Sequence, residues 1–447
     1  MAVLILGAAG AVGKRLCAAL SKRGDCVIAA DRMPRLPAKL TSIVGAVEPG
    51  VDVRDDKALH EVFAVRIPRR PPINPARPPV PLTHDTPRVR QRHSDIEAVW
   101  NLAAPLSVET AMDPAIAEAV TVGGMRSVVG AMRAHGVRKI LFTDSIGSFG
   151  AAAPRNQCAA RWLTENPTQD PGSDYGRQKR GCREVLKEFA ANGNGDPRWA
   201  VLPGVLHAEP VWGNGTTEYA LEALKTAAMG SAERPATYAC PVEPDTTLPM
   251  IWVDDLMRGL LALQDAPEEA LHEPERGYAI PGLSFSANQL FEEIQGRRAG
   301  RAFSTTMALD DNMAAFAKLW PDTLCEEAPN QDLGYSPETD LPQARSRHDL
   351  GGISATSRRA ISARACSTHI PEYISPGEHP VHVSADGDER ARRPRGAPEL
   401  ALDEVPLRAE FDGRAGHAVE VPRYSRDVAE IWRRCGRDAA EISQRYG

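Results

Sequence analysis

Short apolar runs alternate with helix-like stretches along the first half of the chain. The apolar runs include AVLIL, CVIAAD, EAVWNLAA, RKILFTDS and WAVLPG. Between them lie stretches with helical spacing, such as GKRLCAALSKRG, residues 114–136 and residues 175–193. Strands that alternate with helices are joined by right-handed crossovers, which produce a parallel sheet covered on both faces. The pattern therefore predicts an α/β fold with a doubly wound parallel sheet.

The pattern changes at three places, and these changes define the predicted domains. Residues 66–93 contain eight prolines and seven arginines against one acid, so they cannot continue a helix or a central strand. Shorter, mixed elements follow the first domain, and the last part of the chain is polar, arginine-rich and weakly periodic. We predict a Rossmann-type domain over 1–210 with an inserted loop, a smaller C-terminal substrate-binding region over 211–343, and a largely disordered tail over 344–447.

The composition is that of a soluble globular protein, with 42% hydrophobic and 25% charged residues. A net charge of −6 gives no general attraction to nucleic acid or to an anionic membrane. The eight cysteines are scattered without paired Cys or Cys/His spacing, which argues against a metal site or a disulfide framework and fits a reducing compartment. The chain has neither an apolar run of roughly 18 residues nor a signal-peptide pattern, so we expect a cytoplasmic protein.

Glycines follow the first predicted strand at the spacing of a dinucleotide-binding turn. Gly7, Gly10 and Gly13 lie between this strand and the next helix, where small residues allow a pyrophosphate to approach the helix N-terminus. Asp31 ends the second strand, where a carboxylate holds the ribose hydroxyls of NAD. Arg32 would favour the 2′-phosphate of NADP, but the carboxylate of Asp31 should repel that phosphate. We therefore expect NAD as the cofactor.

Four further residues are candidates for the cofactor site. Asp52 and Val53 follow the third predicted strand, at the rim of an adenine site, and Ala103 and Ala104 follow the fourth strand, where small side chains let the backbone pass close to the cofactor. Each of these four is equally well explained as an ordinary turn residue.

A tyrosine and a lysine stand four residues apart in SDYGRQKRG, at the start of a predicted helix. Side chains at i and i+4 share a helix face, so Tyr175 and Lys179 should stand together. An ammonium group beside a phenol favours the phenolate, which takes a proton from a hydroxyl. Ser145 ends a strand, at the sheet edge where parallel sheets bind ligands. We predict that Tyr175 acts as base, that Ser145 binds the same substrate oxygen, and that Lys179 reaches the nicotinamide ribose.

The order G-x-x-G-x-x-G, Asp31, NLAA, Ser145 and Y-x-x-x-K resembles the extended short-chain dehydrogenase/reductase superfamily. GNGTTEYALEALKTA and YACPVEPDTTLPMIWVDDLMRGLLAL are similar to segments of the epimerase-like L-threonine 3-dehydrogenases. The resemblance implies NAD-dependent oxidation of the β-hydroxyl of L-threonine, or of a similar small hydroxy amino acid, to the 2-amino-3-oxo product. It also implies that Ser107 and Thr216 or Thr217 hold the substrate, and that the protein is a homodimer.

Some residues depart from the family pattern. Thr121 stands where the family has Asn, and Asp144 precedes Ser145, where an added carboxylate would weaken the base unless it faces away. Asp254 or Asp255 is expected to cap the following helix. The alternatives are a nucleotide-sugar epimerase or reductase on the same fold, and a non-catalytic NAD-binding regulator. A docking role for residues 66–93 and the tail, independent of catalysis, is a further alternative.

Overall fold

A computed structural model of the chain describes residues 1–65, 95–150, 171–193, 195–208, 215–230, 234, 236–272, 276–296 and 303–351. The chain divides into two units, Met1–His369 and Ile370–Gly447, and all of the described residues belong to the first. The predicted inserted loop, residues 66–93, lies outside the described ranges, and so does the predicted tail beyond residue 351.

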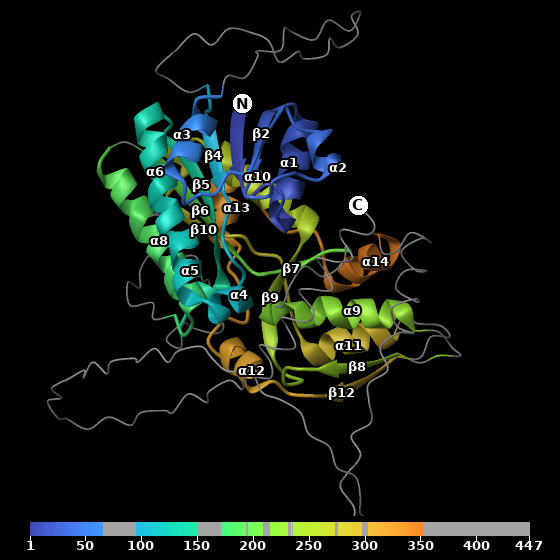
Figure 1. Ribbon diagram of the computed structural model, residues 1–447. Coiled ribbons are helices and arrows are strands. Elements are labelled where there is room, and N and C mark those ends of the chain that lie inside the picture. The colour runs from blue at the N-terminus through green and yellow to red at the C-terminus, as the bar shows by residue number, and fades with distance from the viewer. Residues whose placement is uncertain are drawn as a thin grey trace, which may run out of the picture. The chain divides into compact units, whose positions relative to one another are not determined.

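Seven parallel strands form the central sheet, in the order β10-β6-β5-β4-β1-β2-β3 (Figure 1). The strand order runs outward in two directions from the neighbours β1 and β4, which is the switch point of a Rossmann-type sheet. The predicted doubly wound fold is therefore confirmed. The strands are β1 (Ala2–Leu6), β2 (Cys26–Asp31), β3 (Ala46–Pro49), β4 (Ala98–Asn101), β5 (Lys139–Ser145), β6 (Asp196–Leu202) and β10 (Gly277–Ala279).

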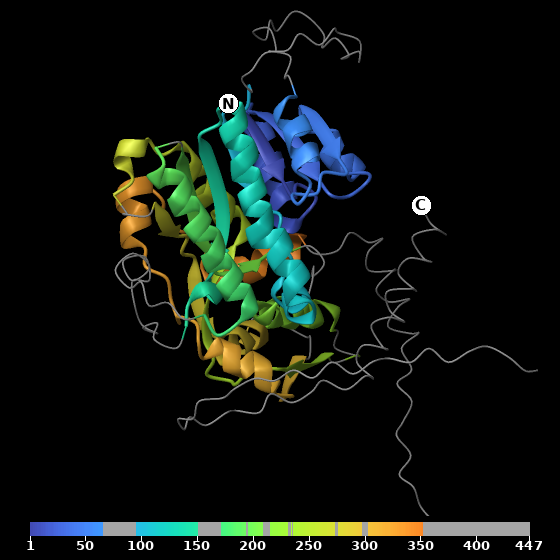
Figure 2. The same ribbon diagram turned by 60° about the vertical axis from the view of Figure 1, so that its left-hand side comes forward.

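Helices cover both faces of this sheet, which explains why its strands are almost continuously apolar. Figure 2 shows α6 and α8 side by side in front of the strands. Trp100 of β4 donates to Gln264 of α10 (2.6 Å), whereas its neighbour Asn101 contacts Met125 of α6, so α10 lies on the opposite face from α6. The helices are α1 (Ala11–Arg23), α2 (Ala38–Thr41), α3 (Asp56–Phe63), α4 (Ser107–Met112), α5 (Pro114–Glu118), α6 (Gly124–His135), α8 (Asp174–Ala191) and α10 (Val253–Asp265).

A π-helical turn, η1 (Ala119–Gly123), joins α5 to α6 into one helical run from Pro114 to His135. By length and composition this run is apolar enough to cross a membrane, but half of its most apolar stretch is buried inside the protein. The core helix of a soluble protein passes the same test, and α6 packs against α3 and α8. We therefore interpret the run as a core helix.

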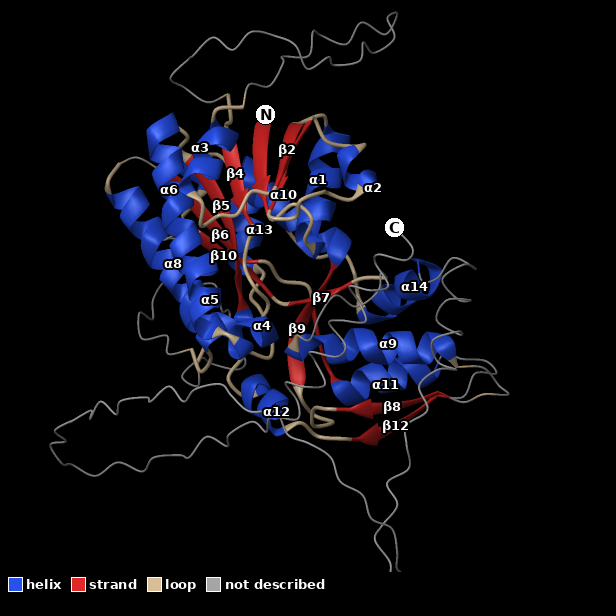
Figure 3. Ribbon diagram, in the orientation of Figure 1, coloured by secondary structure: helices blue, strands red, loops and turns tan. Residues whose placement is uncertain are grey.

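A second hydrophobic core lies in the later part of the chain, around Tyr219, Trp252 and Phe291. Figure 3 shows the paired strands β8 and β12 beside α9 and α11. The strands are β7 (Gly204–Leu206), β8 (Ala236–Cys240), β9 (Thr247–Trp252), β11 (Leu283–Ser286) and β12 (Phe303–Met307). The remaining helices and short turns of the described chain, which contribute to one core or the other, are η2 (Ile146–Ser148), η3 (Thr216–Glu218), α9 (Tyr219–Met229), η4 (Glu268–Ala270), α11 (Ala287–Gly296), α12 (Asp311–Ala317), α13 (Glu327–Leu333) and α14 (Leu341–Gly351).

The two cores are not divided at the predicted boundary. Both α10 and β10 come from the region predicted as separate, yet their residues Leu256, Leu260 and Tyr278 belong to the core of the central sheet. Strand β10 pairs with β6 and extends the central sheet by one strand. The chain thus returns to the first core after building part of the second. The limits at 210 and 343 stay predictions.

The described cysteines include four free thiols, at positions 17, 26, 182 and 240. Burial raises the pKa of Cys17 and of Cys182 to about 12, so both thiols stay protonated and unreactive near neutral pH.

Asp255 anchors a distant segment rather than capping its own helix. Its buried carboxylate accepts from the backbone N–H of Thr339 (2.9 Å) and pairs with Arg258 (2.5 Å). The carboxylate of Asp254 accepts from Trp252 (3.2 Å), and the N-cap of α10 has no side-chain cap hydrogen bond. The predicted capping role is therefore wrong, because Asp255 binds the distant Thr339 and the nearby Arg258, and Asp254 accepts from the Trp252 side chain instead.

We predict that Asp255→Asn lowers the free energy of unfolding by about 1–3 kcal/mol, because it breaks an ion pair at a buried carboxylate. Burial raises the pKa of Asp255, but hydrogen bonds from Arg258 and Thr339 outweigh it, so the pKa lies below its ordinary value. The stabilisation is therefore present above about pH 4 and is lost as the pH falls through the lowered pKa.

Urea unfolding of the wild type and of Asp255→Asn between neutral and acidic pH measures both effects. The exposed neighbour offers a matched control, Asp254→Asn, which should cost less than about 0.5 kcal/mol. Equal losses for the two variants would contradict the anchoring role.

Candidate active site

The glycine turn after β1 is closed by backbone contacts that leave no room for side chains. Gly7 has φ +79°, and a Cβ there would lie 2.9 Å from the backbone nitrogen of Ala103. A Cβ on Gly13 would lie 2.4 Å from the carbonyl oxygen of Gly7, and one on Gly10 would lie 3.2 Å from the same oxygen. Helix α1 begins after Gly10, so its first N–H groups open onto a turn that a pyrophosphate can approach.

Asp31 is fixed against this turn at the end of β2. One carboxylate oxygen accepts from the backbone N–H of Ala9 (2.9 Å), and the other accepts from Met33 (3.1 Å). A carboxylate has roughly four acceptor positions, so two remain for the ribose hydroxyls of a dinucleotide. The residues present therefore fit a nicotinamide dinucleotide, whose adenosine ribose would be held by Asp31.

Three of the remaining cofactor candidates, Asp52, Val53 and Ala103, pack against or pair with neighbouring residues of the protein. Arg54 binds the carboxylate of Asp52 (2.6 Å), and this hydrogen bond holds the pKa of Asp52 below its ordinary value. Val53 is buried against α6, because a Cβ on Gly124 would lie 2.5 Å from its Cγ2. Ala103 approaches the glycine turn directly, as described above.

Ala104 is half-buried in the loop after β4. The cofactor roles of Asp52, Val53, Ala103 and Ala104 stay predictions.

Ser145 and Tyr175 meet on either side of Gly147. Ser145 is the last residue of β5, and Tyr175 is the second residue of α8. A Cβ on Gly147 would lie 3.2 Å from the Tyr175 ring and 3.5 Å from Ser145 Oγ. The backbone N–H of Gly147 also donates to Ser145 Oγ (3.1 Å). The two predicted catalytic side chains therefore lie at one edge of the sheet.

The N-terminus of α8 fits against this turn through a second glycine. Ser173 caps the helix by accepting from the backbone N–H of Gly176 (3.1 Å). A Cβ on Gly176 would lie only 2.1 Å from the carbonyl oxygen of Gly147, so the two backbones touch. Neither Gly147 nor Gly176 was among the predicted site residues, although each lies within two positions of Ser145 or Tyr175.

Lys179 is held one helical turn below Tyr175. Its ammonium group is buried and donates to the backbone oxygen of Thr143 in β5 (2.8 Å). The same nitrogen lies 4.7 Å from the centroid of the Phe142 ring and 5.4 Å from that of the Tyr175 ring. The structure therefore brings together the predicted side chains of positions 145, 175 and 179, while their catalytic roles stay predictions.

The added carboxylate of Asp144 pairs with a cation of α8. Its Oδ2 lies 2.7 Å from Arg183 Nε, and both side chains are buried. Successive strand side chains point to opposite faces, so Asp144 and Ser145 diverge. Thr121 lies in the π-helical turn, where its carbonyl oxygen accepts from the Cys182 thiol (3.3 Å).

The candidate substrate residues lie on segments that follow the carboxyl ends of strands. Ser107 is half-buried at the first residue of α4, in the connection after β4. Thr216 is buried in η3, and Thr217 packs its methyl group against β7, where a Cβ on Gly204 would lie 2.9 Å from it. Strand β7 leaves the carboxyl end of β6, so both segments lie on the expected side of the sheet. The substrate roles stay predictions.

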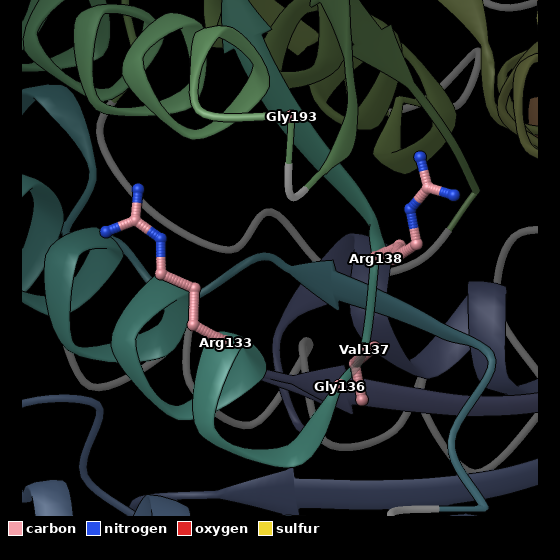
Figure 4. Close-up of a pocket in the computed structure, with 5 residues that line it drawn as sticks. All are labelled: Arg133, Gly136, Val137, Arg138 and Gly193. Carbon is pink, nitrogen blue, oxygen red and sulfur yellow. The ribbon is translucent and has the colours of Figure 1, made fainter.

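A cavity elsewhere in the protein is distinct from this site. It has a volume of about 360 Å³ and is lined by Arg133, Gly136, Val137, Arg138 and Gly193 (Figure 4). Figure 4 shows the two arginines on either side of Gly193; Arg133 lies in the last turn of α6, Arg138 just before β5, and Gly193 just after α8. This is the amino edge of the parallel sheet, opposite Ser145. Within the described ranges, no group of three or more His, Cys, Asp or Glu residues is arranged to hold a metal ion.

Residues 82–274 match the model of the NAD dependent epimerase/dehydratase family. The resemblance to this family is thereby confirmed. The match contains positions 145, 175 and 179, whereas the glycine turn and Asp31 precede it. The family description implies a nicotinamide dinucleotide cofactor, in agreement with the fit of the residues around β1 and β2.

Curated relatives include the mitochondrial L-threonine 3-dehydrogenase of Bos taurus, 29% identical over 246 residues. That match covers 55% of this chain and 62% of the bovine protein, so the chain spans about three fifths of this relative. An uncharacterized epimerase/dehydratase of Staphylococcus haemolyticus is 26% identical over 269 residues, which cover 60% of this chain and 77% of that protein.

Solved structures of L-threonine dehydrogenases have the same fold. A partial consensus L-threonine 3-dehydrogenase is 26% identical with a TM-score of 0.62, over 78% of this chain and 98% of that one. The holo form of a GalE-like L-threonine dehydrogenase from Cupriavidus necator is 24% identical with a TM-score of 0.63, over 78% and 99%.

We predict that Gly13→Ala weakens NAD binding at least about tenfold, a loss of about 1.4 kcal/mol. The added methyl group would collide with the Gly7 carbonyl and displace the turn that receives the pyrophosphate. Titration of NADH fluorescence measures the affinity. Gly130→Ala is the matched control, because a Cβ there meets nothing within 4 Å. Unchanged affinity in a folded Gly13→Ala variant would argue against this cofactor site.

Proposed function

We propose that this protein oxidises the β-hydroxyl of L-threonine with NAD and releases 2-amino-3-oxobutanoate. The observation that carries the proposal is the meeting of Ser145, Tyr175 and Lys179 at the carboxyl edge of β5. The family match and the names of the curated relatives support the reaction class and the substrate.

In the proposed reaction, Tyr175, Ser145 and Lys179 each have a different chemical role. The phenolate of Tyr175 takes the hydroxyl proton of the substrate, while Ser145 Oγ donates a hydrogen bond to the same oxygen. The carbon–hydrogen bond then breaks, its electron pair leaves as a hydride, and the carbonyl double bond forms. When bound, the nicotinamide ring supplies the hydride acceptor. Lys179, anchored to Thr143, places a fixed positive charge beside the phenol ring.

The substrate is a zwitterion and needs partners for its amino and carboxylate groups. We propose that Ser107 and the hydroxyls of Thr216 or Thr217 supply them, because both segments follow the carboxyl edge of the sheet. The methyl group of Thr217 packs against β7, an arrangement that leaves its hydroxyl as the group available for the ligand.

We propose NAD rather than NADP for the same site. The Asp31 carboxylate is buried beside the glycine turn, where it binds hydroxyls and repels a 2′-phosphate. Arg32, the next residue, is exposed.

A nucleotide-sugar epimerase or reductase is the second candidate, because the matched family includes epimerases and the staphylococcal relative is named as one. A sugar nucleotide needs cations for two phosphates. In the described part of the second region, Arg258 pairs with Asp255 and Arg276 pairs with Asp196 and Glu268. These engaged guanidinium groups favour the smaller, zwitterionic substrate.

We predict that purified protein with NAD and L-threonine produces NADH, and that Tyr175→Phe lowers turnover at least about 100-fold through loss of the base. NADH absorbance measures the rate with L-threonine, L-serine, other 3-hydroxy acids and UDP-sugars side by side. Tyr238→Phe, in β8 of the second core, is the matched control and should retain activity. Turnover with UDP-sugars alone would refute the substrate assignment.

A further inference from the structure

Asp144 and Arg183 form a buried ion pair between the two elements that carry the candidate active site. The exposed fraction is 2% for Asp144 and 3% for Arg183, and the Oδ2–Nε distance is 2.7 Å. Asp144 immediately precedes Ser145 in β5. Arg183 follows Lys179 by one turn of α8 and Tyr175 by two, so the three side chains lie along one helix face.

Asp144 also makes contacts that shape the turn after β5. Its Oδ1 accepts from the backbone N–H of Ser145 (2.8 Å). The hydroxyl of Ser148 donates to the backbone oxygen of Ser145 (2.7 Å) and lies 3.4 Å from Asp144 Oδ2. The turn between these residues contains Gly147, where a Cβ would lie 3.2 Å from the Tyr175 ring. One carboxylate therefore links the strand end, the turn and α8.

We propose that Asp144 and Arg183 are positioning residues that hold β5 and α8 together and balance the charge behind the catalytic base. This inference rests on the proposed function, in which Tyr175 takes the substrate proton. Neither residue touches the substrate. The pair acts through Ser145 on one side and through the helix of Tyr175 and Lys179 on the other.

The cost of burying charge explains why the pair acts as a unit. An isolated buried ion loses its hydration, and only a partner at close range compensates for this loss. Two apolar side chains would pack in the same space without that cost. A charged pair instead requires one relative position of strand and helix, because the two groups must meet at hydrogen-bonding distance.

The charges around this pair come from three elements. Helix α8 contributes Lys179 and Arg183, α6 contributes Arg126, and β5 contributes Asp144. Burial raises the pKa of Cys182; the charges of Lys179, Arg126 and Arg183 oppose this rise, and that of Asp144 adds to it. All four charged groups are therefore close enough to Cys182 to influence its pKa. Neutralising Asp144 makes the net charge of these four groups more positive by one unit, and neutralising Arg183 makes it more negative by one unit.

The test compares Asp144→Asn, Arg183→Gln and the double variant, using kcat/KM for L-threonine with NAD across pH. Asp144→Asn leaves an unpaired cation, so the acidic limb of the profile should move to lower pH. Arg183→Gln leaves an unpaired anion, so the limb should move to higher pH. Each shift is expected to be about one pH unit, and the double variant should return close to the wild-type position.

Two controls separate positioning from a merely structural role. Asp196→Asn breaks another buried Asp–Arg pair, at the amino end of β6, and should destabilise the protein without moving the acidic limb. Arg183→Lys keeps the charge and should keep the limb in place, which also covers the case in which Arg183→Gln does not fold. Shifts in the same direction for both single variants, or no shift in either, would overturn the inference.

Urea unfolding of the same variants tests the pairing without any substrate. Each single substitution should lower stability, and the double variant should lose clearly less than the sum of the two. Additive losses would overturn the pairing whatever the activity of the wild type. A wild type inactive towards L-threonine but with non-additive unfolding would instead refute the proposed function and leave the pair established.

Discussion

The contact between the turn after β5 and the first turn of α8 is the constraint on which the candidate site depends. The carbonyl of Gly147 approaches Gly176 so closely that a Cβ on Gly176 would require a shift of the backbone. This contact places a strand end and a helix start within reach of each other, although they are far apart in sequence. Ser145 and Tyr175 occupy the positions next to it, so their approach is a property of the two backbones.

Electrostatics reinforces this backbone contact from inside the protein. The ammonium group of Lys179 donates to β5, and Arg183 binds the carboxylate of Asp144 one turn further along α8. Both cations belong to the helix, and both of their acceptors belong to the strand. The same helix face therefore combines groups of the proposed chemistry with groups that hold the strand in place.

The sequence predicted the features that depend on local pattern. Apolar runs and helical spacing were sufficient for the Rossmann-type sheet, and the glycine spacing was sufficient for the turn after β1. Features that depend on long-range partners were not predictable in the same way. From the sequence, Asp144 is expected to weaken the base, because no local pattern indicates that Arg183 pairs with it. Asp255 is likewise expected to cap its helix, because no local pattern indicates that Thr339 donates to it. The three-residue strand β10 is too short to carry a pattern of its own.

The recruitment of β10 into the central sheet limits how this protein can be rearranged. Its residues lie between segments that build the second core, yet its backbone completes an edge of the first. A graft that replaced everything after β6 with the corresponding part of a relative would also exchange that edge strand. A chimera designed to change the substrate preference is therefore expected to need exchange points on both sides of β10. Such a chimera keeps the native edge strand of the central sheet and replaces the candidate substrate-binding segments around it.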